Sequence, residues 1–231
     1  MVAVIADSPS LPKSELDYAI EHVKKFKIPY TVIKTQELMR EDYIKNNSNR
    51  CYFCKDELYV HLKSILLNKG FKFIVNGTNF DDLGDHRPGL IAAKDHTVYS
   101  PLAEVSLTKK EIRDLSKLIG LPTWDKPAQA CLSSRIPYGT KVSVNSLNQI
   151  EKAEEYLHQQ GFNQVRVRHH DKIARIEITQ KEFSNLFDEN CRKKINDYLK
   201  SLGYLYVTID LDGFRSGSLN DVLNLSKKSG S

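Results

Sequence analysis

The stretch MVAVIADSPSLPKSELDYAIEHVKKFKIPYTVIKT, residues 1–35, decides the fold class of this chain. It contains an apolar run of strand length over 1–7, a segment over 14–26 whose apolar residues recur at helical spacing, and a second apolar run over 28–35. A strand, a helix and a strand in this order predict a parallel sheet covered by helices, with Ser14 as the N-cap of the helix. Ligands of such folds bind at the carboxyl ends of the strands.

The same alternation continues through the first half of the chain. The next helix is expected to end at Gly70, because glycine commonly closes helices in the left-handed conformation. A third strand is expected over 72–79. A further helix over 107–120 carries the capping signal of Thr108 followed three residues later by Glu111. The first half therefore predicts an α/β domain built on a parallel sheet.

The second half follows a different pattern, which predicts a smaller α+β domain. The expected elements are a loop or domain junction over 121–141, a helix over 144–162, a hairpin over 164–179 with its turn at 169–172, a helix over 181–204 and a strand over 205–214. The domain boundaries that we expect are 1–127 for the α/β domain, 128–223 for the α+β domain and 224–231 for a disordered tail.

The composition excludes several classes of protein. The chain of 231 residues is 40% hydrophobic and 27% charged, as a globular protein is, and no apolar run is long enough to span a bilayer. Its first 15 residues lack the basic and apolar regions of a signal peptide, so we expect a cytoplasmic protein with no membrane partner. The net charge of +5 suits phosphate or carboxylate ligands and is too small to indicate nucleic acid.

Three of the four cysteines form a candidate metal site. Cys51 and Cys54 are three residues apart where a helix is expected to begin, so they share a helix face, and the helix N-terminus favours the thiolate form. Cys131, in the loop ACLSSRIPYG, is the candidate third ligand, and three thiolates suit a [4Fe–4S] cluster with one iron open to sulfide. Structural zinc normally takes four protein ligands. Two half-buried cysteines without a metal remain the alternative, and Cys191 has no partner nearby in the sequence.

An acidic loop follows the expected third strand. The segment NGTNFDDLGDHRPG places Asp81, Asp82 and Asp85 beside Arg87. Acidic loops at strand ends bind Mg²⁺ or ribose hydroxyls, although aspartate, asparagine and glycine also build ordinary turns.

Arginines in the second half form a candidate anion site. Arg166 and Arg168 are two residues apart on a strand and therefore point to one face, and the partner strand carries Arg175 and Glu177. Arg215 lies among glycines, where the backbone can approach a ligand closely. Together such arginines predict a phosphate pocket, and a solvated strand face is the alternative.

The motifs NGTNFDDLGDHRPGL, ACLSSRIPYGT, VRVRHHDKIARIE and GFRSG resemble those of the LarE family, the ATP-dependent sacrificial sulfur transferases, and the resemblance runs from about residue 2 to about residue 223. It implies a nucleotide-binding domain of the PP-loop ATP pyrophosphatase type, also called adenine nucleotide alpha hydrolase-like. It further implies adenylation of a pyridinium dicarboxylate mononucleotide by ATP and Mg²⁺, followed by conversion to a thiocarboxylate. These steps belong to the biosynthesis of the nickel-pincer nucleotide cofactor of lactate racemase, and the family members are homo-oligomers.

The cysteines resemble those of one branch of this family. In one branch a single cysteine, matching Cys131, gives up its own sulfur, whereas in the other three cysteines hold a [4Fe–4S] cluster that carries an extra sulfide. Because Cys51 and Cys54 are present as well, the chain resembles the cluster branch.

The resemblance also assigns ligand-binding roles. The positions that match the family's phosphate-binding residues are Arg166, Arg168 and Arg215, with Glu154 as a carboxylate near them. The positions that match its nucleotide cleft are Asp7, Ser8, Gly77, Asp81, Ser134 and Arg135.

One family motif does not occur in this sequence. The phosphate loop SGGxDS, which follows the family's first strand, is absent from the 231 residues, and the sequence begins on what resembles the second strand. Without that loop no glycine-rich helix N-terminus holds pyrophosphate. We favour an N-terminally incomplete chain, because loss of a central strand exposes apolar surface, and a separate polypeptide that supplies the loop is the other explanation. Both leave the adenylating activity of this chain open.

Two other functions stay open. A tRNA 2-thiolation enzyme uses a related fold and a three-cysteine cluster, but it requires a basic, aromatic RNA surface, which the interleaved charges of the second half do not provide. A non-enzymatic iron–sulfur or nucleotide-binding module is the second alternative. Retention on tRNA would favour the first, and lack of ATP–pyrophosphate exchange would favour the second.

Overall fold

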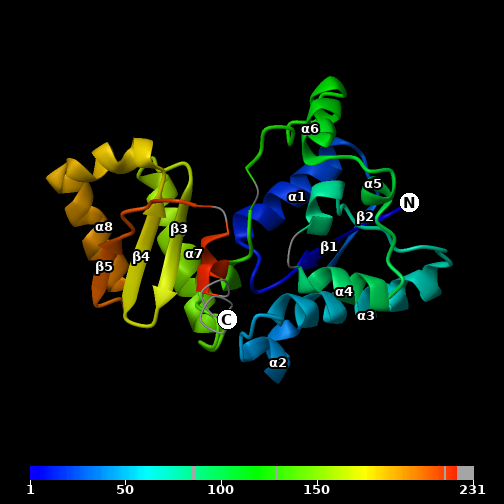
Figure 1. Cartoon of the computed structure of the whole chain (residues 1–231), viewed down its shortest axis with the longest axis horizontal. Coiled ribbons are helices and arrows are strands. Elements are labelled where there is room, and N and C mark those ends of the chain that lie inside the picture. The colour runs from blue at the N-terminus through cyan, green and yellow to red at the C-terminus, as the bar shows by residue number, and fades with distance from the viewer. Residues whose placement is uncertain (85–86, 128, 216, 223–231) are drawn as a thin grey trace, which may run out of the picture. The chain divides into compact units, whose positions relative to one another are not determined.

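The computed structural model describes residues 1–84, 87–127, 129–215 and 217–222, so Asp85 and the predicted tail over 224–231 lie outside the described residues. The chain divides into two compact units (Figure 1). Unit 1 consists of Met1–Ser8 and Ser14–Ala130, and unit 2 of Pro9–Lys13 and Cys131–Ser231. Over the described ranges, no helix combines the length and the apolar character that crossing a bilayer requires.

Unit 1 is an α/β structure with a parallel strand pair. Strands β1 (Ala3–Asp7) and β2 (Tyr30–Lys34) are connected through α1 (Lys13–Lys25) and pair in parallel, which confirms the predicted strand–helix–strand order (Figure 1). Further elements of unit 1 are η1 (Glu37–Met39), α2 (Glu41–Ile44), α3 (Arg50–Lys69), η2 (Phe80–Gly84), α4 (Pro88–Asp95), α5 (Pro101–Glu104) and α6 (Lys109–Leu118).

The third strand predicted over 72–79 is wrong. That segment forms a single parallel bridge, between Val75 and Tyr99. The partner segment is too short for a ladder, because Thr97 has a left-handed φ of 56° and Pro101 already begins α5. The apolar character of residues 72–79 therefore did not predict a strand correctly, because the partner segment offers only Tyr99 for pairing.

The predicted helix ends were largely correct. Gly70 closes α3 in the left-handed conformation with φ of 67°, and Thr108 and Glu111 form the expected capping box at the start of α6. The N-cap predicted at Ser14 is wrong, because α1 already begins at Lys13 and Ser14 lies inside its first turn.

Unit 2 is an α+β structure. Its sheet has the order β3 (Val165–His170), β4 (Ile173–Ile178), β5 (Tyr206–Ile209), with β3 and β4 antiparallel and β4 and β5 parallel (Figure 1). Its helices are α7 (Val144–Gln159) and α8 (Glu189–Ser201), and its 3₁₀ segments are η3 (Leu132–Arg135), η4 (Gln180–Phe187) and η5 (Ser218–Asn220). The single helix predicted over 181–204 is divided at Asp188, whose carboxylate accepts the Cys191 N–H at 2.6 Å and caps α8.

The predicted hairpin is confirmed, but its turn is shorter than expected. His169 and His170 are the last residues of β3, so the turn is 171–172 rather than 169–172. His169 is buried, with its Nδ1 atom 3.1 Å from the Tyr204 hydroxyl, and burial lowers its pKa. The prediction of a turn at His169 is therefore wrong, because this residue is a buried part of β3.

Alternation along the hairpin gives the sheet of unit 2 two different faces. Val167 and Ile176 belong to a buried apolar cluster that includes residues of α7 and α8. Arg166, Arg168 and Glu177 point to the other face, because successive side chains of a strand alternate. The apolar face thus supplies the core of unit 2, and the charged face is left for a polar site.

Candidate functional site

The charged face of unit 2 contains a buried ion pair between Arg135 and Glu154. From the sequence, these two residues were expected to contact different groups of the ligands. Arg135 of η3 donates from Nε to Oε1 of Glu154 at 2.9 Å and from Nη2 to Oε2 at 3.0 Å. Oε1 of Glu154 also accepts the backbone N–H of Val167 at 2.8 Å. Such a bidentate pair fixes the position of both side chains. Arg135, predicted to contact AMP, and Glu154, predicted beside the phosphate, therefore hold each other.

A second buried pair lies on the same face. Arg168 donates from Nε and Nη2 to the two carboxylate oxygens of Glu177, each at 2.8 Å, and Nη2 also donates to the Ser218 hydroxyl at 2.6 Å. Sequence reasoning placed Glu177 on the partner strand but did not pair it with Arg168. The register supplies the reason, because Arg168 lies opposite Arg175 and Glu177 is its diagonal neighbour on the same face.

Arg166 differs from these two arginines. It is buried, at 8% exposure, and within the described part of the chain its guanidinium makes no hydrogen bond or ion pair. Its guanidinium carbon lies 4.4 Å from the ring centroid of Phe214, so the aromatic ring faces the cation. Phe214 is a residue of this site that sequence reasoning missed, although it precedes Arg215 in the quoted motif GFRSG.

The cluster carries one positive charge more than its carboxylates balance. Glu154 compensates Arg135, and Glu177 compensates Arg168. Arg175, which lies 3.5 Å from Glu177, is compensated by Asp210, so the charge of Arg166 is left over. Burial, together with the positive charges of Arg135 and Arg168, lowers the pKa of Arg166 to about 10. Arg166 thus stays protonated at neutral pH in an environment that opposes its charge. An anion bound beside it would relieve both effects.

Both ion pairs also hold the turn that carries Cys131. Nη1 of Arg135 donates to the Cys131 carbonyl oxygen at 3.0 Å, and Nη1 of Arg168 donates to the Ser134 carbonyl oxygen at 2.7 Å. Nη1 of Arg135 also donates to the Ser134 hydroxyl at 3.1 Å. The thiol of Cys131 is half-buried and not in a disulfide. The predicted cysteine and the two predicted arginines therefore form one connected structure.

Arg215 lies in a more exposed position than the other predicted phosphate ligands. Its side chain is 47% exposed and forms ion pairs with Asp221 at 3.1 Å and Asp212 at 3.4 Å. Its role as a phosphate ligand stays a prediction.

In unit 1, the pair Cys51 and Cys54 lies at the beginning of α3. The two residues are one helical turn apart, and neither thiol is in a disulfide; Cys51 is exposed and Cys54 is half-buried. Nη2 of the buried Arg50 is 4.0 Å from the Cys51 sulfur. The two cysteines therefore lie in the first turn of α3, near the helix start that the sequence predicted, and their role as metal ligands stays a prediction.

Contacts with α4 and the preceding loop fix this end of α3. The carboxylate of Asp56 accepts from Arg40 at 2.6 Å and is hydrogen-bonded to Nε2 of His96 at 2.7 Å. The hydrogen bond with His96, followed by that with Arg40, lowers the pKa of Asp56 against the opposing effect of burial. The Tyr52 hydroxyl donates to Asp95 at 3.0 Å. The cysteines are thus carried by a firmly held helix turn, which suits a ligand-binding role.

The three predicted cluster ligands are divided between the two units. Cys51 and Cys54 belong to unit 1, and Cys131 belongs to unit 2. Among the residues that the structure describes, no group of three or more cysteine, histidine or carboxylate side chains is assembled for a metal ion. The donor set nevertheless has the right chemistry, because all three thiols are outside disulfides. The three-thiolate site stays a prediction.

The predicted nucleotide residues Asp7 and Ser8 lie at the carboxyl end of β1, next to buried carboxylates. The Ser8 hydroxyl donates to Glu37, which is fully buried, and the backbone N–H of Gln36 donates to Glu57 at 2.8 Å. Sequence reasoning missed both glutamates, because buried glutamate is rare and nothing in their spacing marks them. The role of Asp7 and Ser8 in binding a nucleotide stays a prediction.

The acidic loop of unit 1 is used partly for local structure. Asp81 accepts the backbone N–H of Lys109 at 2.8 Å, at the start of α6, and Asp82 accepts the N–H of Asn79 at 3.2 Å. Gly77 has open space where a Cβ would lie, so packing does not demand glycine there. The assignment of Gly77 and Asp81 to a nucleotide cleft stays a prediction.

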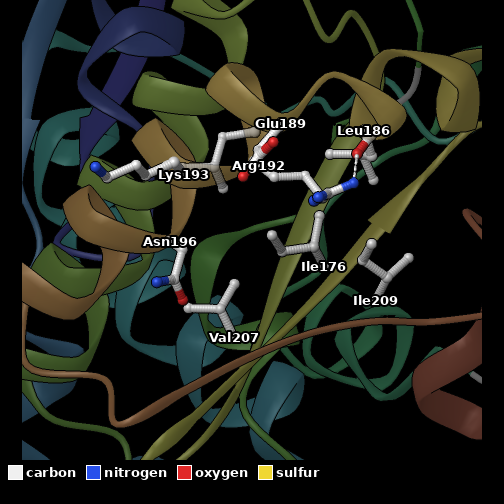
Figure 2. Close-up of a pocket in the computed structure, with 9 residues that line it drawn as sticks. Ile176, Leu186, Glu189, Arg192, Lys193, Asn196, Val207 and Ile209 are labelled. Carbon is white, nitrogen blue, oxygen red and sulfur yellow. Dashed lines mark hydrogen bonds between the residues drawn. The ribbon is translucent and has the colours of Figure 1, made fainter.

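A groove of about 420 Å³ lies on the apolar face of the unit 2 sheet, along α8 and β5 (Figure 2). Figure 2 shows Arg192 above the groove, where it donates to the Leu186 carbonyl oxygen at 3.4 Å. The lining residues are Ile176, Leu186, Glu189, Arg192, Lys193, Ile195, Asn196, Val207 and Ile209. They include none of the predicted site residues, so the groove is separate from the arginine cluster.

No protein-family model matches the chain. The chain is 44% identical over 222 residues to the uncharacterized protein slr1717 of Synechocystis sp., across 96% of this chain and 83% of that protein. It is 30% identical over 215 residues to the uncharacterized protein MJ0830 of Methanocaldococcus jannaschii, across 93% and 81%. It is 37% identical over 224 residues to pyridinium-3,5-bisthiocarboxylic acid mononucleotide synthase of Lactiplantibacillus plantarum, across 96% of this chain and 80% of the synthase. This extent of identity shows that the chain belongs to the LarE family, the family of that synthase.

Proposed function

We propose that this protein is an ATP-dependent sulfur transferase of nickel-pincer nucleotide cofactor biosynthesis. It converts the adenylated carboxylate of a pyridinium mononucleotide to a thiocarboxylate. The printed name of the L. plantarum relative, a synthase of a pyridinium bisthiocarboxylic acid mononucleotide, supports this reaction class. The motifs that carry the resemblance lie in the part of the chain that matches this relative.

The observation that carries the proposal is the uncompensated charge of Arg166. A mononucleotide has one phosphate monoester, and its dianion matches a buried cation that has no carboxylate partner among the described residues. Arg135 and Arg168 add positive potential while their donors are occupied by Glu154 and Glu177. The cluster therefore binds phosphate chiefly through Arg166, with the two ion pairs as a fixed frame.

The sulfur site consists of Cys51, Cys54 and Cys131, which would hold a [4Fe–4S] cluster. Such a cluster supplies a sulfide that can be replaced after transfer. The contribution of the chain is positional, because Arg135 and Arg168 hold the turn of Cys131 through backbone carbonyls. The same two ion pairs thus serve the phosphate site and the turn of Cys131, the proposed cluster ligand from unit 2.

The nucleotide site would take ATP with Mg²⁺ and join a carboxylate oxygen of the substrate to the α-phosphorus of ATP, with release of pyrophosphate. That oxygen then leaves as part of AMP when sulfur attacks the carboxyl carbon. Its proposed residues are Asp7, Ser8, Gly77, Asp81, Ser134 and Arg135. Support for the first two is their place at the carboxyl end of a parallel strand, where nucleotides bind in α/β folds.

Anaerobic incubation with the adenylated pyridinium dicarboxylate mononucleotide tests the reaction directly. After reconstitution with iron and sulfide, the protein is expected to release AMP and form the thiocarboxylate, both detected by mass spectrometry. Supplying the adenylated compound bypasses the ATP step, so the test does not depend on the SGGxDS loop. Release of AMP with only the carboxylate recovered would contradict the sulfur-transfer proposal.

Replacing Arg166 by alanine is expected to weaken binding of the pyridinium dicarboxylate mononucleotide about tenfold to a hundredfold, because a charged hydrogen bond to phosphate is lost. Isothermal titration calorimetry on parent and variant measures the change. Lys172→Ala is the matched control, since Lys172 is an exposed cation in the turn of the same hairpin. Equal dissociation constants for Arg166→Ala and the parent would contradict the proposal that Arg166 binds the substrate phosphate.

A further inference from the structure

The arginines of the unit 2 cluster are fixed in two different ways. Arg135 and Arg168 each direct Nε and Nη2 at a carboxylate, so the edge of the guanidinium that recognises oxygen pairs is occupied. Arg166 instead lies over the Phe214 ring, with 4.4 Å from the guanidinium carbon to the ring centroid. An aromatic ring carries no oxygen that accepts a hydrogen bond, so a guanidinium held over it keeps N–H donors for an oxygen ligand.

We propose that Phe214 is a positioning residue for substrate phosphate: its ring holds the guanidinium group of Arg166 without an ion pair and leaves N–H donors for phosphate oxygens. This role rests on the proposed function, because it presumes a phosphorylated ligand at Arg166. A carboxylate in place of Phe214 would also hold Arg166, but it would compete with the ligand for the same donors. The aromatic ring avoids that competition.

The backbone fixes the position of Phe214. Its N–H donates to the carbonyl oxygen of Ile178 at 2.8 Å, at the end of β4. The preceding Gly213 has a φ of 70°, and a Cβ there would lie 2.7 Å from the same carbonyl oxygen. Only glycine fits at that position, because both the conformation and the space exclude a side chain. The backbone conformation at Gly213 and the hydrogen bond of the Phe214 N–H therefore hold the Phe214 ring at Arg166.

The surrounding charges agree with this role. Arg135, Arg168, Glu154 and Glu177 are the charged groups that act on Arg166, and the carboxylates among them are bound by the other two arginines. Without Phe214, the guanidinium of Arg166 could turn toward Glu154 or Glu177 and compete for those carboxylates. The Phe214 ring thus keeps the Arg166 guanidinium away from these carboxylates, so that its charge is left for a phosphate ligand.

The test compares Phe214→Leu, which keeps an apolar side chain without a π face, with Phe214→Tyr, which keeps the ring. The probes are nicotinic acid mononucleotide, a commercially available pyridinium carboxylate mononucleotide, and nicotinic acid riboside, which lacks the phosphate. Titration of each full-length variant gives the dissociation constants, and thermal unfolding checks that each variant is folded. Phe214→Met replaces the leucine variant if the latter does not fold.

We expect Phe214→Leu to weaken binding of the mononucleotide about tenfold, as loss of a desolvated cation–π contact implies. Binding of the riboside is expected to be unchanged, and Phe214→Tyr is expected to stay within about twofold of the parent, because the ring is retained. If the parent prefers the mononucleotide but the leucine and tyrosine variants bind it equally, the positioning role is wrong while the phosphate site stands. If the parent binds mononucleotide and riboside equally, the phosphate site itself fails, and the role of Phe214 fails with it.

Discussion

Replacing Glu154 by glutamine is expected to lower the free energy of unfolding of unit 2 by about 3–5 kcal/mol, one of the largest single-residue effects in this protein. Glu154 is buried and bound by two N–H groups of Arg135. Glutamine has nearly the same shape and retains an oxygen for the Val167 N–H, but it leaves the Arg135 charge buried without compensation. Urea unfolding followed by circular dichroism measures the change.

The adjacent residue supplies the control for this experiment. Glu155 follows Glu154 in α7 and is exposed, so Glu155→Gln is expected to stay within about 0.5 kcal/mol of the parent. A double variant with Arg135→Met and Glu154→Leu is expected to recover part of the loss, since apolar residues of similar size do not leave a buried charge. If Glu154→Gln is no less stable than Glu155→Gln, the buried pair is not a structural element of the site.

The stability loss has a functional counterpart. Arg135 holds the Cys131 carbonyl oxygen through Nη1 while Glu154 holds the other side of the guanidinium. Once the carboxylate charge is removed, Arg135 is free to move toward solvent, and the turn of Cys131 loses one of its fixed contacts. A folded preparation of Glu154→Gln at low temperature is therefore expected to show faster amide hydrogen exchange at Ser134 and Arg135 than the parent.

Local patterns of the sequence were sufficient for most elements of the fold. The strand–helix–strand order of residues 1–35, the left-handed Gly70 and the capping box of Thr108 each depend on residues close together in the chain. The third strand failed for the opposite reason. Whether an apolar run becomes a strand depends on its partner, and Tyr99 offered only a single pairing position.

In the candidate site too, features set by residues close together in the chain were predicted, whereas contacts with distant segments were not. The spacing of Arg166 and Arg168 showed that they share a face, but not that only one of them pairs with a carboxylate. Register alone does not give that difference, because Glu177 lies directly opposite Arg166 and yet binds Arg168, its diagonal neighbour. Arg166 instead lies over the ring of Phe214, 48 positions beyond it in the printed sequence. Side chains that arrive from distant segments leave no periodic signal in the sequence.

Replacing Cys131 by serine is expected to abolish formation of the iron–sulfur chromophore altogether. Anaerobic reconstitution of the parent with iron and sulfide is expected to give a brown protein with broad absorbance at about 400 nm, typical of thiolate-ligated clusters. Cys51→Ser and Cys54→Ser are expected to lose the same absorbance, because a cluster held by three thiolates has no spare protein ligand. Absorbance and protein-bound iron together measure the outcome, independently of sulfur transfer.

Cys191 provides the matched control, because its position opposes the chemistry that a cluster ligand requires. Burial and the nearby carboxylate of Asp188 raise the pKa of the Cys191 thiol, so the thiolate form is disfavoured there. Cys191→Ser is therefore expected to retain the absorbance and iron content of the parent. Undiminished absorbance in Cys131→Ser would remove Cys131 from the ligand set. The arginine frame would then hold a turn without a sulfur ligand, and the link between the phosphate site and the sulfur site would be lost.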